Sequence, residues 1–170
     1  RPTPCEYAPY YAKYIAALPD GDIIDLLEAQ QSQLATYPRR VPADRETFRY
    51  GDGKWSVREV FGHLTDAERV FGYRLLCISR GQTTSLPGFD ENQFVAEANA
   101  NERPLRALVD ELVMVRETNL IVMRALTDEA WTRVGTANNS PVSVRGLAYI
   151  MAGHISHHFG ILRDRYGIND

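Results

Sequence analysis

The fold is decided by residues 143–166, which read SVRGLAYIMAGHISHHFGILRDRY. Apolar residues recur there every three or four positions, a spacing that predicts an amphipathic helix with one buried face. Ser143 is placed to cap the start of this helix, and Gly167 to end it. At 100° per residue, His154 and His158 fall on either side of the centre of the apolar face. Two imidazoles are therefore expected in the interior of the protein.

This pair of buried imidazoles needs polar partners. An unpartnered polar group in an apolar interior costs about 1–3 kcal/mol. Histidines at i and i+4 on one helix face, such as His154 and His158, can share a divalent metal ion, because neutral imidazole is its commonest protein ligand. The alternative is a pair of core histidines that only form structural hydrogen bonds. His157 lies on the flank of the same face, and we expect it beside the ligands or at the surface.

Three further stretches have the same helical periodicity. They cover residues 22–37, 57–80 and 104–126. Ser56 and Glu59 form an S-x-x-E capping box at the start of the second stretch, and Pro38 is expected to end the first. Four long amphipathic helices and almost no strand signal predict an all-α four-helix bundle, with residues 1–170 forming a single domain.

Smaller elements are expected around these helices. Residues 7–18 repeat tyrosines at helical spacing and predict a lead-in helix, whereas residues 38–54 are rich in Pro, Gly and charge and predict a loop. Residues 132–144 are a weak hairpin candidate, with Asn138 and Asn139 at its turn.

The connection between the second and third helices is long. It covers residues 81–103 and includes a short helix candidate within residues 90–98. A long crossover of this kind would let the two helices run parallel. Its loop, residues 82–98, is placed with Phe89 and Trp55 to shape a substrate entrance; packing at the helix start is the alternative role for Trp55.

Composition excludes several classes of function. Of 170 residues, 44% are hydrophobic and 24% charged, and the net charge is −3, as in ordinary globular proteins. No basic patch occurs, which argues against nucleic-acid binding as the main task. No apolar run approaches the roughly 20 residues of a membrane span, so no membrane partner is expected. Cys5 and Cys77 form no disulfide framework, and we expect a cytoplasmic protein.

The fourth histidine, His63, lies at the edge of the apolar face of the second helix. In a bundle it can face His154 and His158 on another helix, giving three nitrogen ligands with coordination positions left open. That ligand count is typical of catalytic rather than structural metal sites. Asp66, one turn from His63, could orient an imidazole or supply a fourth ligand, and a solvated surface charge is its alternative role.

Glycines recur at every seventh position of the last helix. Gly146, Gly153 and Gly160 lie on the face away from His154 and His158, where each costs about 1 kcal/mol relative to alanine. Such a smooth ridge permits close approach of another segment. We expect either a homodimer across this ridge or packing of the N-terminal segment against it.

Several of these stretches together resemble the DinB/YfiT-like superfamily, and within it the DinB_2 branch. They are EYAPYY (6–11), WSVRE (55–59), GHLTDAER (62–69), LPGFD (86–90), HISHH (154–158) and ILR (161–163). The resemblance implies a four-helix bundle of unusual connectivity, often dimeric, with a divalent metal on a three-residue motif. In this sequence that motif falls on His63, His154 and His158.

The resemblance also implies a kind of activity. The family includes metal-dependent transferases of low-molecular-weight thiols (bacillithiol, mycothiol, glutathione) and a mycothiol-dependent isomerase. We therefore expect a metal-dependent enzyme acting on a small-molecule substrate, either a low-molecular-weight-thiol S-transferase or a hydrolase. Three imidazoles suit Zn, Ni, Fe or Cu, and the thiol itself is an expected cofactor. The alternative is a non-catalytic metal- or ligand-binding bundle in a stress response.

Overall fold

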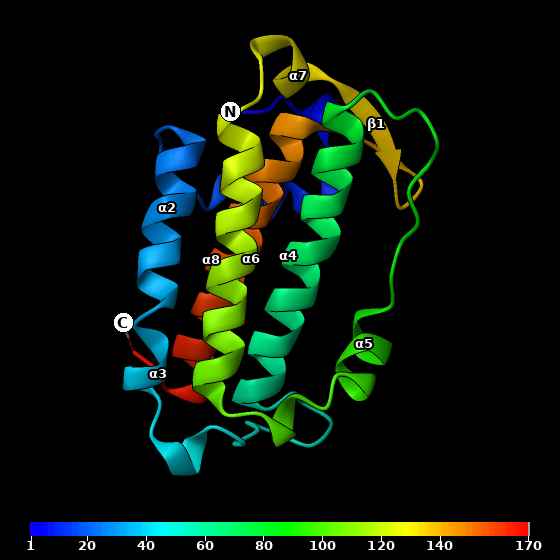
Figure 1. Ribbon diagram of the computed structural model, residues 1–170. Coiled ribbons are helices and arrows are strands. Elements are labelled where there is room, and N and C mark those ends of the chain that lie inside the picture. The colour runs from blue at the N-terminus through cyan, green and yellow to red at the C-terminus, as the bar shows by residue number, and fades with distance from the viewer. Residues whose placement is uncertain (170) are drawn as a thin grey trace.

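Four long helices form the body of the protein in the computed structural model, which describes residues 1–169 (Figure 1). They are α2 (Ile23–Leu34), α4 (Val57–Ser79), α6 (Leu105–Arg124) and α8 (Val144–Tyr166). The shorter elements are α1 (Ala12–Ala16), α3 (Tyr37–Arg40), α5 (Glu91–Glu97), α7 (Asp128–Thr132), β1 (Val134–Ala137) and β2 (Ser140–Ser143). The four-helix bundle predicted from the sequence is confirmed.

Several ends of the long helices lie at the residues that their sequence signals indicate. Ser56 Oγ accepts a hydrogen bond from the Glu59 backbone (3.1 Å), and the Glu59 carboxylate accepts one from the Ser56 backbone (2.7 Å). Ser143 Oγ caps α8 by accepting from the backbone of Gly146 (2.8 Å). Gly167 ends α8 in the left-handed region, with φ of 68°. These caps set where along each helix the histidines lie.

Helices α4 and α6 run in the same direction. The chain leaves the end of α4, passes along the bundle through α5 and reaches the start of α6 beside the start of α4 (Figure 1). Contacts advance in step along both helices. The Glu68 carboxylate pairs with Arg116 (2.7 Å), and one turn further on Gly72 lies against Asn119. The connection therefore carries α5 along the outside of α4.

The core lies between the long helices and is mostly apolar. Its middle holds one buried ion pair, in which Arg116 of α6 donates to both carboxylate oxygens of Glu68 on α4 (2.7 and 2.9 Å). Gln30 of α2 joins this pair, since its side-chain oxygen accepts from Arg116 (3.4 Å) and its amide donates to the Ala152 carbonyl on α8 (2.8 Å).

Within residues 1–169, no helix is apolar over enough of its length to cross a membrane.

The hairpin predicted near residue 138 is present. Strands β1 and β2 pair antiparallel, with Val134 opposite Ser143 and Ala137 opposite Ser140. Asn138 and Asn139 form the turn with φ of 50° and 59°, the positive values that a tight two-residue hairpin requires. Leu86, from the connection after α4, hydrogen bonds to β1 through the Thr136 carbonyl (2.9 Å) and so ties that connection to the hairpin.

Three predictions about the first 54 residues were wrong in detail. The expected helix over residues 7–18 is only α1, preceded by 3₁₀ turns, because Pro9 holds Ala8 in extended backbone and lacks an amide hydrogen. Pro38 does not end the first long helix, which stops at Leu34. It lies instead in the first turn of α3, where its missing amide hydrogen costs nothing, so residues 38–54 are not all loop.

The N-terminal segment packs on the glycine ridge of α8. A Cβ at Gly146 would lie 2.5 Å from the Glu6 carbonyl oxygen, and one at Gly153 would lie 2.7 Å from the Tyr14 backbone. Gly160 has no such neighbour within 4 Å. Two of the three glycines are therefore explained by contacts within the chain, and the homodimer stays a prediction that this ridge does not support.

We expect Gly153→Ala to destabilise the protein by about 1–3 kcal/mol, because the new methyl group overlaps the Tyr14 backbone. Gly160→Ala is the matched control. It lies on the same helix with open space around it, so alanine should stabilise the fold by about 0.5–1 kcal/mol. Urea unfolding of both variants measures the difference, and equal stability of Gly153→Ala and the parent protein would contradict the packing.

Candidate metal centre

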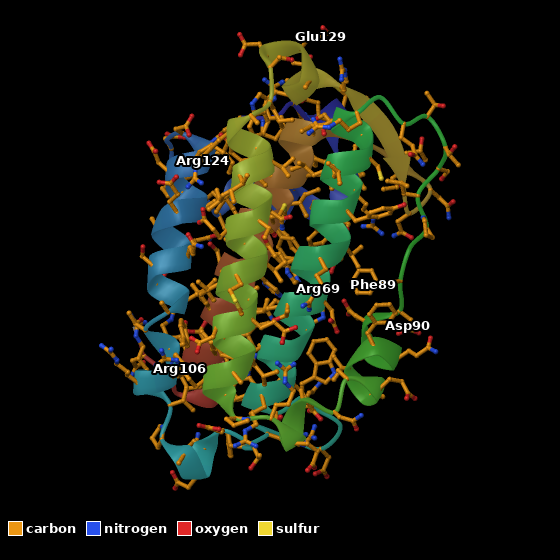
Figure 2. The ribbon with its side chains drawn as sticks, viewed as in Figure 1. Arg69, Phe89, Asp90, Arg106, Arg124 and Glu129 are labelled. Atoms are coloured by element: carbon orange, nitrogen blue, oxygen red, sulfur yellow. The ribbon has the colours of Figure 1, made fainter. Side chains whose placement is uncertain are left out.

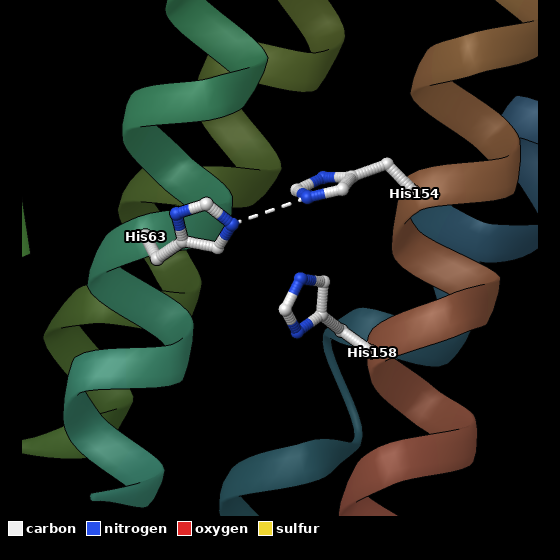
Figure 3. Close-up of side chains that lie close together, drawn as sticks. All are labelled: His63, His154 and His158. Atoms are coloured by element: carbon white, nitrogen blue, oxygen red, sulfur yellow. Dashed lines mark hydrogen bonds between the residues drawn. The ribbon is translucent and has the colours of Figure 1, made fainter. Parts of the chain in front are cut away.

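The two longest helices bring three histidines together. His63 lies in the second turn of α4, and His154 and His158 lie one turn apart on α8. Their rings point toward one another across the space between the helices (Figure 3). All three are buried, with exposed fractions of 2%, 8% and 8%. Tyr166 near the end of α8 donates to the Trp55 carbonyl just before α4 (2.6 Å), which holds the facing helices in place below the histidines.

The spacing of the nitrogens fits a shared metal ion. One ring nitrogen from each histidine lies within 4.8 Å of the other two, and His63 Nε2 and His154 Nε2 are 3.1 Å apart. Imidazole nitrogens bind zinc at about 2.0–2.1 Å, so two ligands at this separation subtend about 100° at the ion. The residues present therefore fit a divalent cation.

The hydrogen bonds of the histidines do not explain their burial. Nδ1 of His63 and Nδ1 of His158 have no hydrogen-bond partner. A purely structural pair of core histidines would be expected to satisfy its ring nitrogens within the protein, because an orphaned buried group is costly. The alternative of simple structural hydrogen bonding thus accounts for only one contact, between His63 and His154.

The histidines are held in their uncharged form. Burial lowers the pKa of His63 to about 4 and that of His158 to about 3. Burial also lowers the pKa of His154 far below its ordinary value, with a further contribution from the neighbouring imidazoles. At neutral pH each ring therefore keeps a nitrogen lone pair free for a metal.

A cavity of about 400 Å³ opens beside the three histidines. Its walls come from the N-terminal segment, α4, α8 and the connection after α4. Besides the histidines they comprise Tyr10, Tyr11, Tyr14, Trp55, Ala67, Phe71, Arg74, Phe89, Glu91, Asn138 and His157. Trp55 lies against His63, with ring centroids 4.7 Å apart, and Phe71 lies 5.7 Å from His154. A small molecule in this cavity would contact the histidines on one side and aromatic rings on the others.

The connection after α4 supplies part of this wall. Phe89 lies on the segment that descends beside α4 just before α5 (Figure 2). The sequence-based expectation that Trp55 and Phe89 lie near the entrance agrees with their positions in the cavity wall. The rest of loop 82–98 contributes Glu91.

The two expected supporting residues lie in different places. His157 lines the cavity and packs on Tyr14, with ring centroids 4.8 Å apart. Asp66 does not reach the histidines. Three residues after His63, it lies about 60° away around the helix, where it lines a separate cavity and lies 3.9 Å from Arg69. His63 Nδ1 has no partner, so Asp66 does not orient that ring.

Several residues of the cavity were not anticipated from the sequence. Tyr10, Tyr11 and Tyr14 were assigned only to a helix, and Arg74 was passed over. Arg74 had a readable signal, because it follows Phe71 by three residues on the apolar face of α4, where a charge is out of place. Nothing local placed the tyrosines beside the histidines, since that contact joins segments about 140 residues apart.

Fold and site together define a four-helix bundle in which three histidines from two facing helices are spaced as a shared divalent cation requires. Residues 26–162 match the DinB superfamily, and the chain belongs to this family. This agrees with the resemblance found in the sequence motifs.

Individual relatives are distant but cover most of the chain. A protein of Oceanobacillus iheyensis named "Putative metal-dependent hydrolase" is 21% identical over 154 residues, which are 86% of this chain and 88% of that protein. The structure of YfiT from Bacillus subtilis, described as "a probable metal-dependent hydrolase with an unusual four-helix bundle topology", has a TM-score of 0.76 and 20% identity, covering 86% of this chain and 87% of its own.

A structure of the mycothiol-dependent maleylpyruvate isomerase is also similar. It has a TM-score of 0.67 and 14% identity, and the match covers 85% of this chain and 60% of the isomerase. At these identities the structural likenesses show a shared fold.

The lowered pKa values predict how pH affects the metal-free protein. In the unfolded chain histidine titrates near pH 6.5, whereas in the fold His63 and His158 titrate near 4 and 3. Between these values the unfolded chain binds more protons, so stability is lost as the pH falls from about 6.5 toward 3. Each histidine contributes a slope of about 1.4 kcal/mol per pH unit within its own window.

Urea unfolding between pH 7 and pH 4 measures this effect. The variant His63→Gln removes one titrating ring, so its stability should fall less steeply with decreasing pH than that of the parent. His157→Gln, at a half-buried ring, should change the slope less. Parallel pH profiles for the parent and His63→Gln would show that His63 is not held neutral by the fold.

Proposed function

We propose that this protein is a metal-dependent enzyme that holds one divalent cation on His63, His154 and His158 and acts on a small molecule in the adjoining cavity. The observation that carries the proposal is the convergence of three uncharged imidazoles from two helices on the wall of an open cavity. Three protein ligands leave positions for a further molecule, as in catalytic rather than structural sites.

The leading reaction is transfer of a low-molecular-weight thiol to an electrophile. A divalent cation in such a site lowers the pKa of a bound thiol or water, so that a nucleophile is available at neutral pH. The chain's own residues hold the three nitrogens in place and exclude bulk water with Trp55, Phe71 and Tyr14 around the rings. In the overall reaction a carbon–sulfur bond forms, the leaving group departs with its electron pair, and the thiol proton passes to solvent.

Hydrolysis is the second candidate. It is favoured by the names of two relatives, each described as a metal-dependent hydrolase. Thiol chemistry is favoured by the isomerase of similar fold, which is named as mycothiol-dependent. Three imidazoles suit Zn, Ni or Fe, and metal availability commonly decides among such ions.

Metal binding is the first consequence to measure. We expect His154→Ala to weaken Zn²⁺ affinity on the order of 100-fold or more, because even the partners behind metal ligands are worth 10–100-fold. His157→Ala is the control, since its ring lines the same cavity without belonging to the histidine trio. Competition titration with a chromogenic chelator gives both affinities. Unchanged affinity of His154→Ala would remove the metal site.

A substrate panel then separates the reactions. We expect protein loaded with Zn²⁺, Ni²⁺ or Fe²⁺ to join glutathione or cysteine to 1-chloro-2,4-dinitrobenzene faster than the metal-free protein, and His154→Ala to lose this gain. Release of nitrophenol from 4-nitrophenyl esters without a thiol would instead indicate a hydrolase. Metal binding without turnover in either assay would identify a non-catalytic metal-binding bundle.

A further inference from the structure

A buried arginine lies in the cavity wall without an acidic partner. Arg74 of α4 is 4% exposed and lines the same cavity as the three histidines. Its Nη2 donates to the Pro87 carbonyl (2.7 Å), whereas its Nε has no acceptor. Within residues 1–169 no carboxylate forms an ion pair with it. A buried guanidinium normally has a carboxylate or several hydrogen bonds, because an unpaired buried charge is expensive.

Comparison with the other buried arginine shows how unusual this is. Arg116 is fully buried, and it donates through both Nε and Nη2 to the Glu68 carboxylate. Arg74 has the same planar set of donors and lacks the anion. The difference is that Arg74 borders open space that a ligand can enter, whereas Arg116 lies in the closed core.

Arg74 and the histidines are placed to act on one molecule. Its guanidinium lies 5.8 Å from the centre of the Phe71 ring, and the ring of His154 lies 5.7 Å from the same centre. A ligand lying along Phe71 could thus reach the metal ligands with one end and Arg74 with the other.

Resting on the function proposed above, we propose that Arg74 binds a carboxylate of the substrate or thiol whose other end meets the three histidines. A carboxylate matches the guanidinium fork, which favours planar anions. It is preferred to a phosphate because Arg74 is the single Arg or Lys among the residues lining this cavity, and Glu91 in the same wall would repel a second negative charge. Arg74 therefore selects acids with a spacer between the carboxylate and the reacting end.

The test uses protein loaded with Co²⁺, whose visible and near-ultraviolet spectrum changes when a thiolate coordinates. The probes are mercaptocarboxylic acids of increasing length, from mercaptoacetate to 6-mercaptohexanoate, each paired with the mercapto-alcohol of equal length. For at least one length we expect the acid to bind about ten-fold or more tightly than its alcohol, as for a charge-assisted contact.

Substitution of the arginine provides the second arm. In Arg74→Gln, which keeps a polar side chain and removes the positive charge, we expect the preference for acid over alcohol to fall to about one. Arg80→Gln, at an exposed arginine one residue past α4, should keep the preference. An acid preference that persists in Arg74→Gln would overturn the proposal. If Arg74→Gln does not fold, the comparison of acids and alcohols on the parent protein decides.

The outcomes separate this inference from the proposed function. Acids and alcohols that bind the Co²⁺-loaded parent equally at every length would overturn the role of Arg74 and leave the metal site intact. Failure of the protein to take up Co²⁺, or of every thiol to alter its spectrum, would overturn the proposed function and this inference with it.

Discussion

The arrangement depends on keeping three imidazoles uncharged in a small volume between α4 and α8. His63 Nε2 and His154 Nε2 are 3.1 Å apart, a distance at which two imidazolium rings would repel strongly. Burial removes that problem by lowering the pKa of each ring, and the lone pairs that result are what a cation requires. Burial of the three imidazoles thus affects both the stability of the metal-free fold and its affinity for a metal ion. A bound divalent cation would be linked to folding, since the unfolded chain presents no such cluster.

The helices that carry the histidines are held in register by contacts away from the site. The buried Glu68–Arg116 pair fixes α4 against α6, and Gln30 connects that pair through α2 to the backbone of α8 at Ala152. Breaking such a pair on one side leaves an uncompensated buried charge, so it defines a particular helix arrangement more than it adds net stability. Because Ala152 precedes His154 by two residues, this network bears directly on where the His154 ring lies.

Much of this fold could be predicted from local signals. The capping box at Ser56 and Glu59, the cap at Ser143 and the glycine at Gly167 gave helix limits within about a residue, since capping depends on adjacent backbone groups. The pair His154 and His158 could be recognised because a helix places i and i+4 together. The Glu68–Arg116 pair could not, because it joins residues 48 positions apart and places a charged side chain of α6 in the core. The position of Asp66, in contrast, follows from its spacing, because three residues after His63 place it about 60° away around the helix. The other features that could not be predicted depend on contacts between segments far apart in the sequence. The position of the tyrosines beside the histidines is one of them.

The segment before α2 packs against the bundle and also lines the cavity beside the histidines. Residues before α2 hold on to the bundle through Glu6, whose carboxylate accepts from Ser143 and Arg145, and through the smooth side of α8 at Gly146 and Gly153. None of these anchors involves the tyrosine rings that face the cavity. Exchanges at Tyr10, which is 63% exposed, can therefore change the wall of the cavity while the bundle and its histidines stay as they are.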